Sequence, residues 1–216
     1  MRASQAFTAG AVASAALLAA GAVGAANTPY FPGDVAVERW IQDVPFGVLS
    51  RVMDLTNAIA AERETMLAIV LAVVIGVVRW RAGVLVSLGI PAVDAENYLK
   101  ELVRRPRPSG ALVQIREHDA GFSFPSGHTC FYAWLSILLL VAVWPWLPRR
   151  ARPFAIAAGC VLVLIACVGR VWVGAHWPSD ALGGALFGVV WAWLAWIVWR
   201  RATRESSPRP EQPATS

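Results

Sequence analysis

Three long apolar runs constrain this chain more than any other feature of its sequence. They are Thr129–Leu147, Phe154–Trp172 and Ala181–Trp199. Each is close to the length of about 20 residues that a helix needs to cross the hydrocarbon core of a bilayer. The composition agrees, because 57% of the residues are hydrophobic and only 15% are charged, against about 25% charged in soluble domains. The sequence therefore predicts an all-α fold, a polytopic helical bundle in a membrane.

Three further segments bring the expected number of transmembrane helices to about six: Ala3–Ala26, Met66–Val78 and Ala82–Lys100. The first fits either a retained helix or a cleaved signal peptide with a small-residue cleavage site, and its length favours the helix. The second is short enough to be a buried core helix, but the following Arg79-Trp80-Arg81 cluster can anchor it at an interface. The third turns polar toward its end, which predicts a span that enters a polar cavity and kinks at Pro91.

The other segments lie outside these runs. Residues 27–64 carry apolar residues at spacings of three and four, interrupted at Pro45, which is typical of one or two amphipathic helices on a membrane surface. A plain connecting segment packed on the bundle fits the pattern equally well. Residues 200–216 are polar and rich in Pro and Ser, so we expect a disordered cytoplasmic tail. Residues 1–199 then form one domain.

Basic clusters set the expected orientation. If six helices cross the membrane, four basic clusters fall on the same side of it. They are Arg2, Arg79 with Arg81, Arg149 with Arg150 and Arg152, and Arg200 with Arg201 and Arg204. By the positive-inside rule this side is cytoplasmic. Residues 27–64, the 101–127 loop and the 170–180 turn then share the extracytoplasmic face of the cell (inner) membrane. The 101–127 loop is itself rich in Arg, which breaks the rule unless a ligand neutralises those charges.

Charge and cysteine usage exclude several classes of function. The net charge of +5 comes mostly from short Arg clusters between apolar runs, whereas nucleic-acid binding needs a basic face on a soluble module. The cysteines form no Cys-x-x-Cys pair, so neither a disulfide framework nor a zinc site is indicated. They are Cys130, Cys160 and Cys167, and we expect them to pack as small apolar residues.

Three polar clusters fall on the predicted extracytoplasmic face, and each suits a phosphate. They are Lys100 with Arg107-Pro108, Pro125-Ser126-Gly127-His128, and Arg170 with His176 and Asp180. Lys100, Arg107 and Arg170 supply positive charge, and an arginine fork matches phosphoryl oxygens. Ser126 and Gly127 precede a predicted helix, whose free backbone N–H groups and dipole favour an anion.

The two histidines of these clusters can divide the chemistry of phosphate transfer. His128 and His176 supply one nucleophile and one proton donor. Asp180 follows His176 by four residues, so its carboxylate can reach the imidazole across one helical turn and fix its tautomer. A simpler interpretation of the third cluster alone is an interfacial turn whose charges face water.

Together, Lys100-x6-Arg107-Pro108, Pro125-Ser126-Gly127-His128 and Arg170-x5-His176-x3-Asp180 resemble the three signature motifs of the type 2 phosphatidic acid phosphatase (PAP2) superfamily. The resemblance implies that His176 attacks phosphorus and forms a phosphohistidine, while Asp180 holds its other ring nitrogen. His128 would protonate the leaving oxygen and then activate water. The residues implied to bind phosphate are Lys100, Arg107, Ser126, Gly127 and Arg170. No metal or other cofactor is implied.

One position departs from the family pattern. The third motif usually begins Ser-Arg, whereas Gly169 precedes Arg170 in this chain. The missing hydroxyl predicts a weaker or altered contact with the phosphate oxygens. It does not predict loss of activity, because the backbone N–H remains.

We therefore expect a bacterial membrane lipid phosphatase whose substrate, a lipid phosphate or diphosphate, has its tail among the membrane lipids. Bacterial members of the resembled family act on undecaprenyl diphosphate, phosphatidylglycerol phosphate or phosphatidic acid, and we rank undecaprenyl diphosphate first. A vanadate haloperoxidase uses a similar constellation but is soluble. A non-catalytic lipid binder would not need the complete set of His128, His176 and Asp180. The sequence carries no signal for the oligomeric state.

Some polar and aromatic residues beside the motifs have simpler expected roles. We expect His118 to be a solvated loop residue, with substrate contact as the less favoured alternative. Arg104 and Arg105 fit contact with a lipid phosphate and a solvated or headgroup-binding role equally well. Acidic and amide side chains before the first motif should line the cavity or pair with Lys100 and the arginines: Asp94, Glu96 and Asn97. A tryptophan series should pack against lipid and form an interfacial belt: Trp191, Trp193, Trp196 and Trp199.

Overall fold

The computed structural model describes residues 2–59 and 61–205, and every regular element in these ranges is helical. The first helices are α1 (Arg2–Asn27), α2 (Asp34–Asp43), α3 (Val48–Ala58), α4 (Ala61–Val78), α5 (Trp80–Ser87) and α6 (Ala92–Val103). The others are α7 (Gly127–Val143), the 3₁₀ turn η1 (Arg149–Ala151), α8 (Arg152–Trp172) and α9 (Pro178–Glu205). The predicted all-α class is confirmed.

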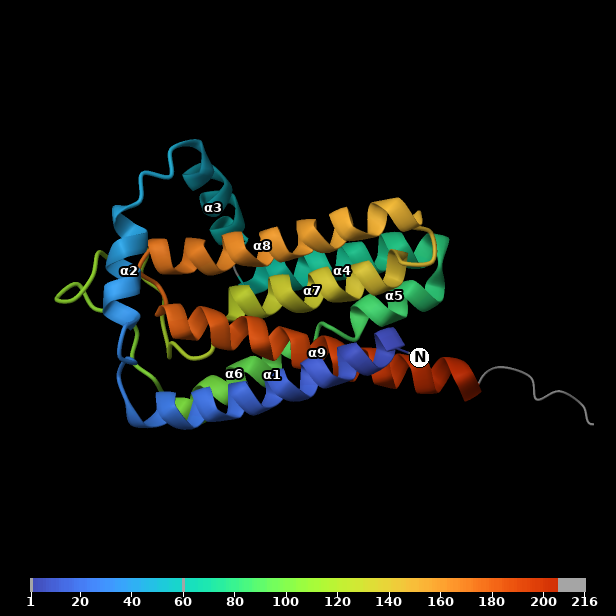
Figure 1. Ribbon diagram of the computed structural model, residues 1–216, viewed down its shortest axis with the longest axis horizontal. Helices are drawn as coiled ribbons and strands as arrows, with labels where there is room; N and C mark the ends of the chain where they lie inside the picture. Colours follow the sequence, from blue (N-terminus) through green and yellow to red (C-terminus); the bar gives the residue numbers. More distant parts are fainter. Residues whose placement is uncertain (1, 60, 206–216) are drawn as a thin grey trace, which may run out of the picture.

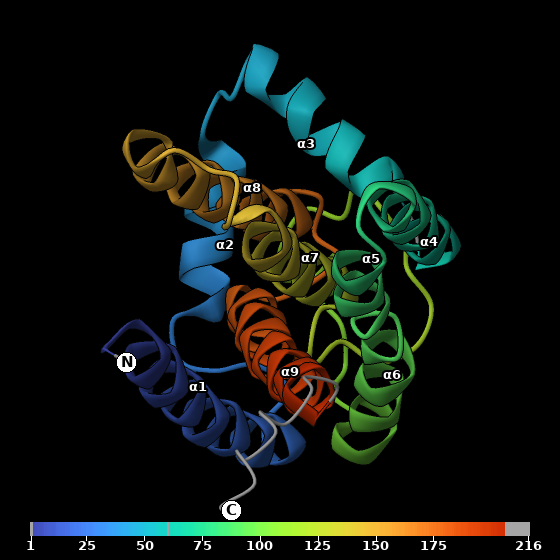
Figure 2. The ribbon, with the colours of Figure 1, turned by 90° about the vertical axis from the view of Figure 1, so that its right-hand side faces the viewer.

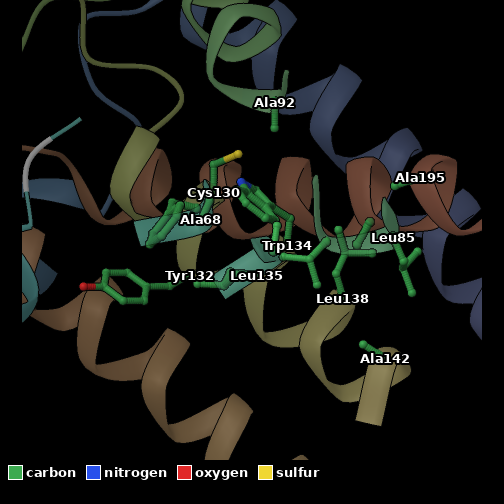
Figure 3. Packing of buried hydrophobic residues seen from close by; sticks show 14 of the residues in the cluster. Ala68, Leu85, Ala92, Cys130, Tyr132, Trp134, Leu135, Leu138, Ala142 and Ala195 are labelled. Carbon is green, nitrogen blue, oxygen red and sulfur yellow. The ribbon is translucent and has the colours of Figure 1, made fainter. Parts of the chain in front are cut away.

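Helix α7 is the centre of the bundle. It packs against α4, α5, α8 and α9, and Figure 2 shows it surrounded by these helices. Its sequence is apolar all round, which is typical of a helix buried within a bundle. Trp134 and Leu138 of α7 are buried beside Leu85 of α5 and Ala195 of α9 (Figure 3). The rings of Phe131 and Trp134 meet edge to face, with centroids 5.3 Å apart.

Helix α9 approaches the start of α7 closely because of a glycine. A Cβ atom at Gly184 would collide with the side chain of Thr129 and the carbonyl of Ser126. Only glycine fits at such a contact between helices. The close approach brings together the first turns of α7 and α9, and the backbone N–H of Ser126 donates to the carbonyl of Asp180 at 3.0 Å.

The chain is a polytopic helical membrane protein. Among the described residues, three helical segments are long and apolar enough to cross a membrane: Ser4–Asn27, Arg149–Trp172 and Pro178–Thr203. Helix α7 is a shorter apolar helix. The span expected over Ala82–Lys100 is broken rather than kinked, since α5 ends at Ser87 and α6 begins after Pro91, whose ring cannot continue a preceding helix. Figure 1 shows α5 and α6 following one another along the length of the bundle.

The two ends of the bundle carry different features. The start of α1, the α4–α5 and α7–α8 connections and the end of α9 lie at one end (Figure 1). Helix α2 and the turn between α8 and α9 lie at the other end. Of the alternatives for residues 27–64, the structure has two helices, α2 and α3, and α3 packs on α8. Both also expose apolar side chains, including Trp40 and Val48.

The structure corrects the start of the expected disordered tail and adds internal contacts for the tryptophan series. Helix α9 continues to Glu205, so residues 200–205 are helical rather than disordered; residues 206–216 lie outside the described ranges. The tryptophans of α9 do not only face lipid, because three indole N–H groups donate hydrogen bonds within the protein. These join Trp191 to the Leu88 carbonyl, Trp193 to the Thr8 hydroxyl and Trp199 to the Arg81 carbonyl. The indoles therefore fasten α9 to α1 and to the α5 region.

Candidate active site

Residues of the three motifs meet at one cavity of about 270 Å³. Five of the predicted site residues line it: Lys100, Arg107, Gly127, His128 and His176. The other lining residues are Glu64, Val93, Glu96, Asn97, Asp119, Ala120, Cys130, Phe131 and Trp134. The cavity therefore lies between α4, α6, α7 and the loop that joins α6 to α7.

His176 lies in the tight turn between α8 and α9, which includes Gly174 at a φ of 75°. Its Nδ1 lies 2.8 Å from the backbone carbonyl of Ser123, and this contact places the ring proton on Nδ1. Arg107 donates from Nη1 to Nε2 at 3.0 Å. Burial lowers the pKa of His176, and the charges of Arg107 and Arg170 lower it further. The imidazole is therefore neutral, with the lone pair of Nε2 on the cavity side.

Asp180 does not bind His176 directly, contrary to the prediction. Its Oδ2 accepts from the Ser123 hydroxyl at 2.5 Å and from the Trp177 backbone N–H at 3.0 Å. The four-residue spacing fails because α9 begins only at Pro178, so His176 and Asp180 do not share a helical turn. Ser123 connects the two, since its carbonyl accepts from His176 and its hydroxyl donates to Asp180.

Arg105 is a buried structural cation, and the prediction of a solvated or headgroup-binding residue is wrong for it. Its side chain is fully buried between Asp180 Oδ1 at 2.5 Å and Asp34 Oδ2 at 2.9 Å. Asp34 also accepts from the backbone N–H and the hydroxyl of Ser179. The network joins α2, the loop after α6 and the first turn of α9. Its neighbour Arg104 is exposed, as expected.

The cations of the motifs are paired with carboxylates. Lys100 Nζ lies 2.7 Å from Glu96 Oε1, one turn away on α6. Arg170 is fully buried and contacts Asp119 and Glu117, the latter at 3.2 Å. Arg107 contacts the same Asp119 carboxylate at 3.3 Å. Asp119 thus joins two arginines from different motifs, as an anionic ligand would.

The start of α7 presents only part of the predicted anion site. Gly127 and His128 line the cavity, but Ser126 is fully buried and does not. The backbone N–H of Ser126 is engaged by the Asp180 carbonyl. Direct contact of Ser126 with a phosphate is therefore not supported by the geometry, because the tight packing of α9 on α7 covers this residue.

Gly169 also lies away from the cavity lining. A Cβ at this position would lie 3.3 Å from Cβ of Met53 and 3.5 Å from Oδ1 of Asn57, both on α3. The missing side chain therefore points toward α3. The expectation that its absence weakens the contact with phosphate oxygens has no support in this arrangement.

Comparison with known proteins assigns the family. Residues 80–204, more than half of the chain, match the family described as PAP2 superfamily. The chain belongs to the PAP2 superfamily. Among its curated PAP2-like relatives, phosphatidylglycerophosphatase B of Bacillus subtilis is 35% identical over 96 residues, which cover 43% of this chain and 45% of that protein. A putative undecaprenyl-diphosphatase, YbjG of Escherichia coli, is 28% identical over 66% of this chain and 61% of that protein.

A further relative, lipid A 1-phosphatase of Rhizobium johnstonii, is 33% identical over 49% of this chain and 42% of that protein. The PAP2 chain thus spans less than two thirds of each of these relatives. Among solved structures, a transmembrane PAP2 type phosphatidylglycerolphosphate phosphatase from Bacillus subtilis superimposes with a TM-score of 0.69. That match covers 90% of this chain and 97% of the other at 22% identity. The likeness supports the shared fold.

Several residues of the PAP2 site carried no readable signal in the sequence. Ser123, Asp34 and Glu64 lie outside the motifs, and their roles depend on contacts between distant segments. Asp119 could have been suspected only as an acid in an arginine-rich loop. Of the residues given simpler roles, His118 and Asp94 are exposed and do not line the cavity, whereas Glu96 and Asn97 do.

Proposed function

We propose that this PAP2 protein is a membrane phosphatase that hydrolyses a lipid phosphate or diphosphate through a phosphohistidine. The observation that carries the proposal is the buried, neutral His176, whose Nε2 faces a cavity with Lys100, Arg107 and His128 on its walls. A nucleophile, a proton donor and fixed cations within one cavity are the parts that phosphoryl transfer requires.

The reaction has two steps. His176 Nε2 attacks phosphorus in line, the bond to the leaving oxygen breaks, and His128 gives that oxygen a proton. Arg107 and Lys100 neutralise the phosphoryl oxygens, and the carboxylates that they now contact give way to the substrate. The Ser123 carbonyl holds Nδ1–H while the ring carries the phosphoryl group. His128 then takes a proton from water, which attacks phosphorus, and phosphate leaves with His176 neutral again. These steps require no metal ion.

We rank undecaprenyl diphosphate first among substrates, with phosphatidylglycerol phosphate and phosphatidic acid as alternatives. The names of the relatives support a lipid substrate, since they include a phosphatidylglycerophosphatase, a putative undecaprenyl-diphosphatase and a lipid A 1-phosphatase.

We also propose that the protein lies in the inner membrane with its active site on the extracytoplasmic face. The cationic connections at one end of the bundle support this orientation by the positive-inside rule. The turn between α8 and α9, which contains His176, lies at the opposite end together with the start of α9 (Figure 1).

The test is phosphate release from a panel of these lipids by the purified, detergent-solubilised protein. We expect His176→Ala to lose at least about 1,000-fold in kcat, and wild type to accumulate an acid-labile phosphohistidine when quenched. His118→Ala is the matched control, because His118 is exposed and outside the cavity. Equal release by wild type and His176→Ala would contradict the proposal. Lipid binding without hydrolysis would indicate a lipid-binding protein. Oxidation of halide in the presence of added vanadate would indicate a haloperoxidase.

A further inference from the structure

Glu64 is a buried carboxylate on the cavity wall that none of the motifs includes. It lies in the first turn of α4, is 3% exposed and lines the cavity together with His128. Its Oε1 lies 3.7 Å from Nδ1 of His128. This distance is long for a hydrogen bond, but catalytic contacts are often loose before substrate binds.

The other carboxylates of the cavity have different partners. Glu96 pairs with Lys100, and Asp119 pairs with Arg107 and Arg170. In the described part of the chain, the basic group beside the Glu64 carboxyl is the His128 imidazole, and Oε1 of Glu64 accepts no hydrogen bond. A buried carboxylate without a cation or proton is costly, so Glu64 shares a compensating proton with the neighbouring imidazole.

The second ring nitrogen of His128 remains available for chemistry. Within the described ranges, its Nε2 has no hydrogen-bond partner although it is buried, and the residue lines the cavity. His128 therefore has one nitrogen toward a carboxylate and the other toward the space where substrate would bind. A carboxylate that orients an imidazole and stabilises its charged form is the arrangement found in hydrolytic triads.

We propose that Glu64 is a positioning residue that orients His128 and supports it as the general acid by sharing a proton with it; this inference rests on the proposed phosphatase function. In the resting pair one proton lies between the Glu64 carboxyl group and Nδ1 of His128, and a second proton on Nε2 is directed to the leaving oxygen. When the P–O bond breaks, its electron pair goes to that oxygen, which takes the Nε2 proton. His128 is then neutral with its remaining proton on Nδ1. The attacking water later returns a proton to Nε2.

The test compares leaving groups that differ in their need for a proton. For dioctanoyl phosphatidic acid, whose alkoxide must be protonated, we expect Glu64→Gln to lower kcat/KM by about 10- to 100-fold. For p-nitrophenyl phosphate, whose phenolate leaves without a proton, we expect a change within about threefold. The ratio kcat/KM is the right quantity because it reports the steps up to departure of the leaving group. A purely structural role would affect both substrates equally.

Three further variants sharpen the result. Glu64→Asp keeps a carboxylate and should recover part of the loss, and Glu101→Gln, an exposed site on α6, should match wild type on both substrates. Glu64→Gln combined with His128→Ala should be no worse than His128→Ala alone, because the two residues act as a unit. Equal losses on both substrates, or additive losses in the double variant, would overturn the role of Glu64. Hydrolysis of neither substrate by wild type would instead overturn the phosphatase function, and this role with it.

Discussion

At the scale of single residues, Ser123 connects two residues of the third motif, His176 and Asp180. Its carbonyl fixes the tautomer of His176, and its hydroxyl anchors Asp180. The backbone carbonyl is a neutral acceptor, so it orients the imidazole without raising its proton affinity as a directly bound carboxylate would. The neutral state of His176 therefore follows from burial and from this choice of partner.

Glu38 provides a pH-dependent prediction at the same scale. This side chain of α2 is fully buried, and in the described part of the chain neither carboxylate oxygen has a hydrogen-bond partner. Burial raises the pKa of Glu38 to about 8, and the charges of Asp180 and Asp34 contribute. The folded protein thus favours the protonated form, so this part of the stability is complete below the ordinary pKa of the unfolded chain and is lost as pH rises toward 8.

We expect Glu38→Gln to raise the thermal unfolding temperature at pH 9 relative to wild type, with little difference at pH 5. The amide cannot ionise, so it avoids the cost of a buried charge at high pH. The measurement is thermal unfolding in detergent across this pH range, with Asp43→Asn at the exposed end of α2 as the control. A Glu38→Gln difference that does not grow with pH would contradict the prediction.

At the scale of elements, Arg105 joins three segments that are distant in sequence. Its guanidinium contacts Asp34 of α2 and both Ser179 and Asp180 of α9, and its own backbone carbonyl accepts from Ser123. One fork with several donors suits two carboxylates at once, which an ammonium group would not do as well. Helix α2 is therefore fastened to the turn that carries His176.

Replacement of this cation should be strongly destabilising. We expect Arg105→Gln to lower the free energy of unfolding by about 3–5 kcal/mol, because it leaves the buried Asp34 and Asp180 without their cation. The measurement is chemical or thermal unfolding of the purified protein. The adjacent exposed Arg104 provides a matched control, and Arg104→Gln should change stability little. Equal stability of the two variants would show that the network does not hold α2 to α9.

At the scale of the whole molecule, the bundle separates its basic connections from the cavity that the motif residues line. The charged groups that are hardest to place in a bilayer either lie at the ends of helices or pair within the protein. Arg170, for example, is at the last turn of α8 and fully buried against acidic partners. An ionisable residue within an apolar run is tolerated only in such a position.

The proposed orientation predicts which loops a membrane-impermeant maleimide can reach. In a background without Cys130, Cys160 and Cys167, Ser109→Cys in the exposed loop after α6 should be labelled in intact spheroplasts. Arg150→Cys, in the exposed α7–α8 connection, should be labelled only after the membrane is permeabilised. The reverse pattern would place the active site on the cytoplasmic side.

The sequence determined the helical class, the approximate spans and the residues of the three motifs. These follow from local properties: apolar runs as long as a bilayer is thick, charges at their ends, and residue spacing within short segments. It also predicted one or two short helices before α4, with a plain connecting segment as the alternative, and a kink at Pro91. Its errors came from the same source, because the spacing of His176 and Asp180 predicted a contact on a helix that does not begin until Pro178.

The tertiary structure alone decided which polar groups meet. Ser123 lies 53 residues from His176, and Asp34 lies 71 residues from Arg105, so no periodicity can reveal either contact. Glu64 reaches His128 only because α4 packs beside α7. Ser126 is covered only because Gly184 lets α9 approach the same helix. The motifs specify the chemistry, whereas burial and helix packing decide which neighbours set the charge and orientation of each group.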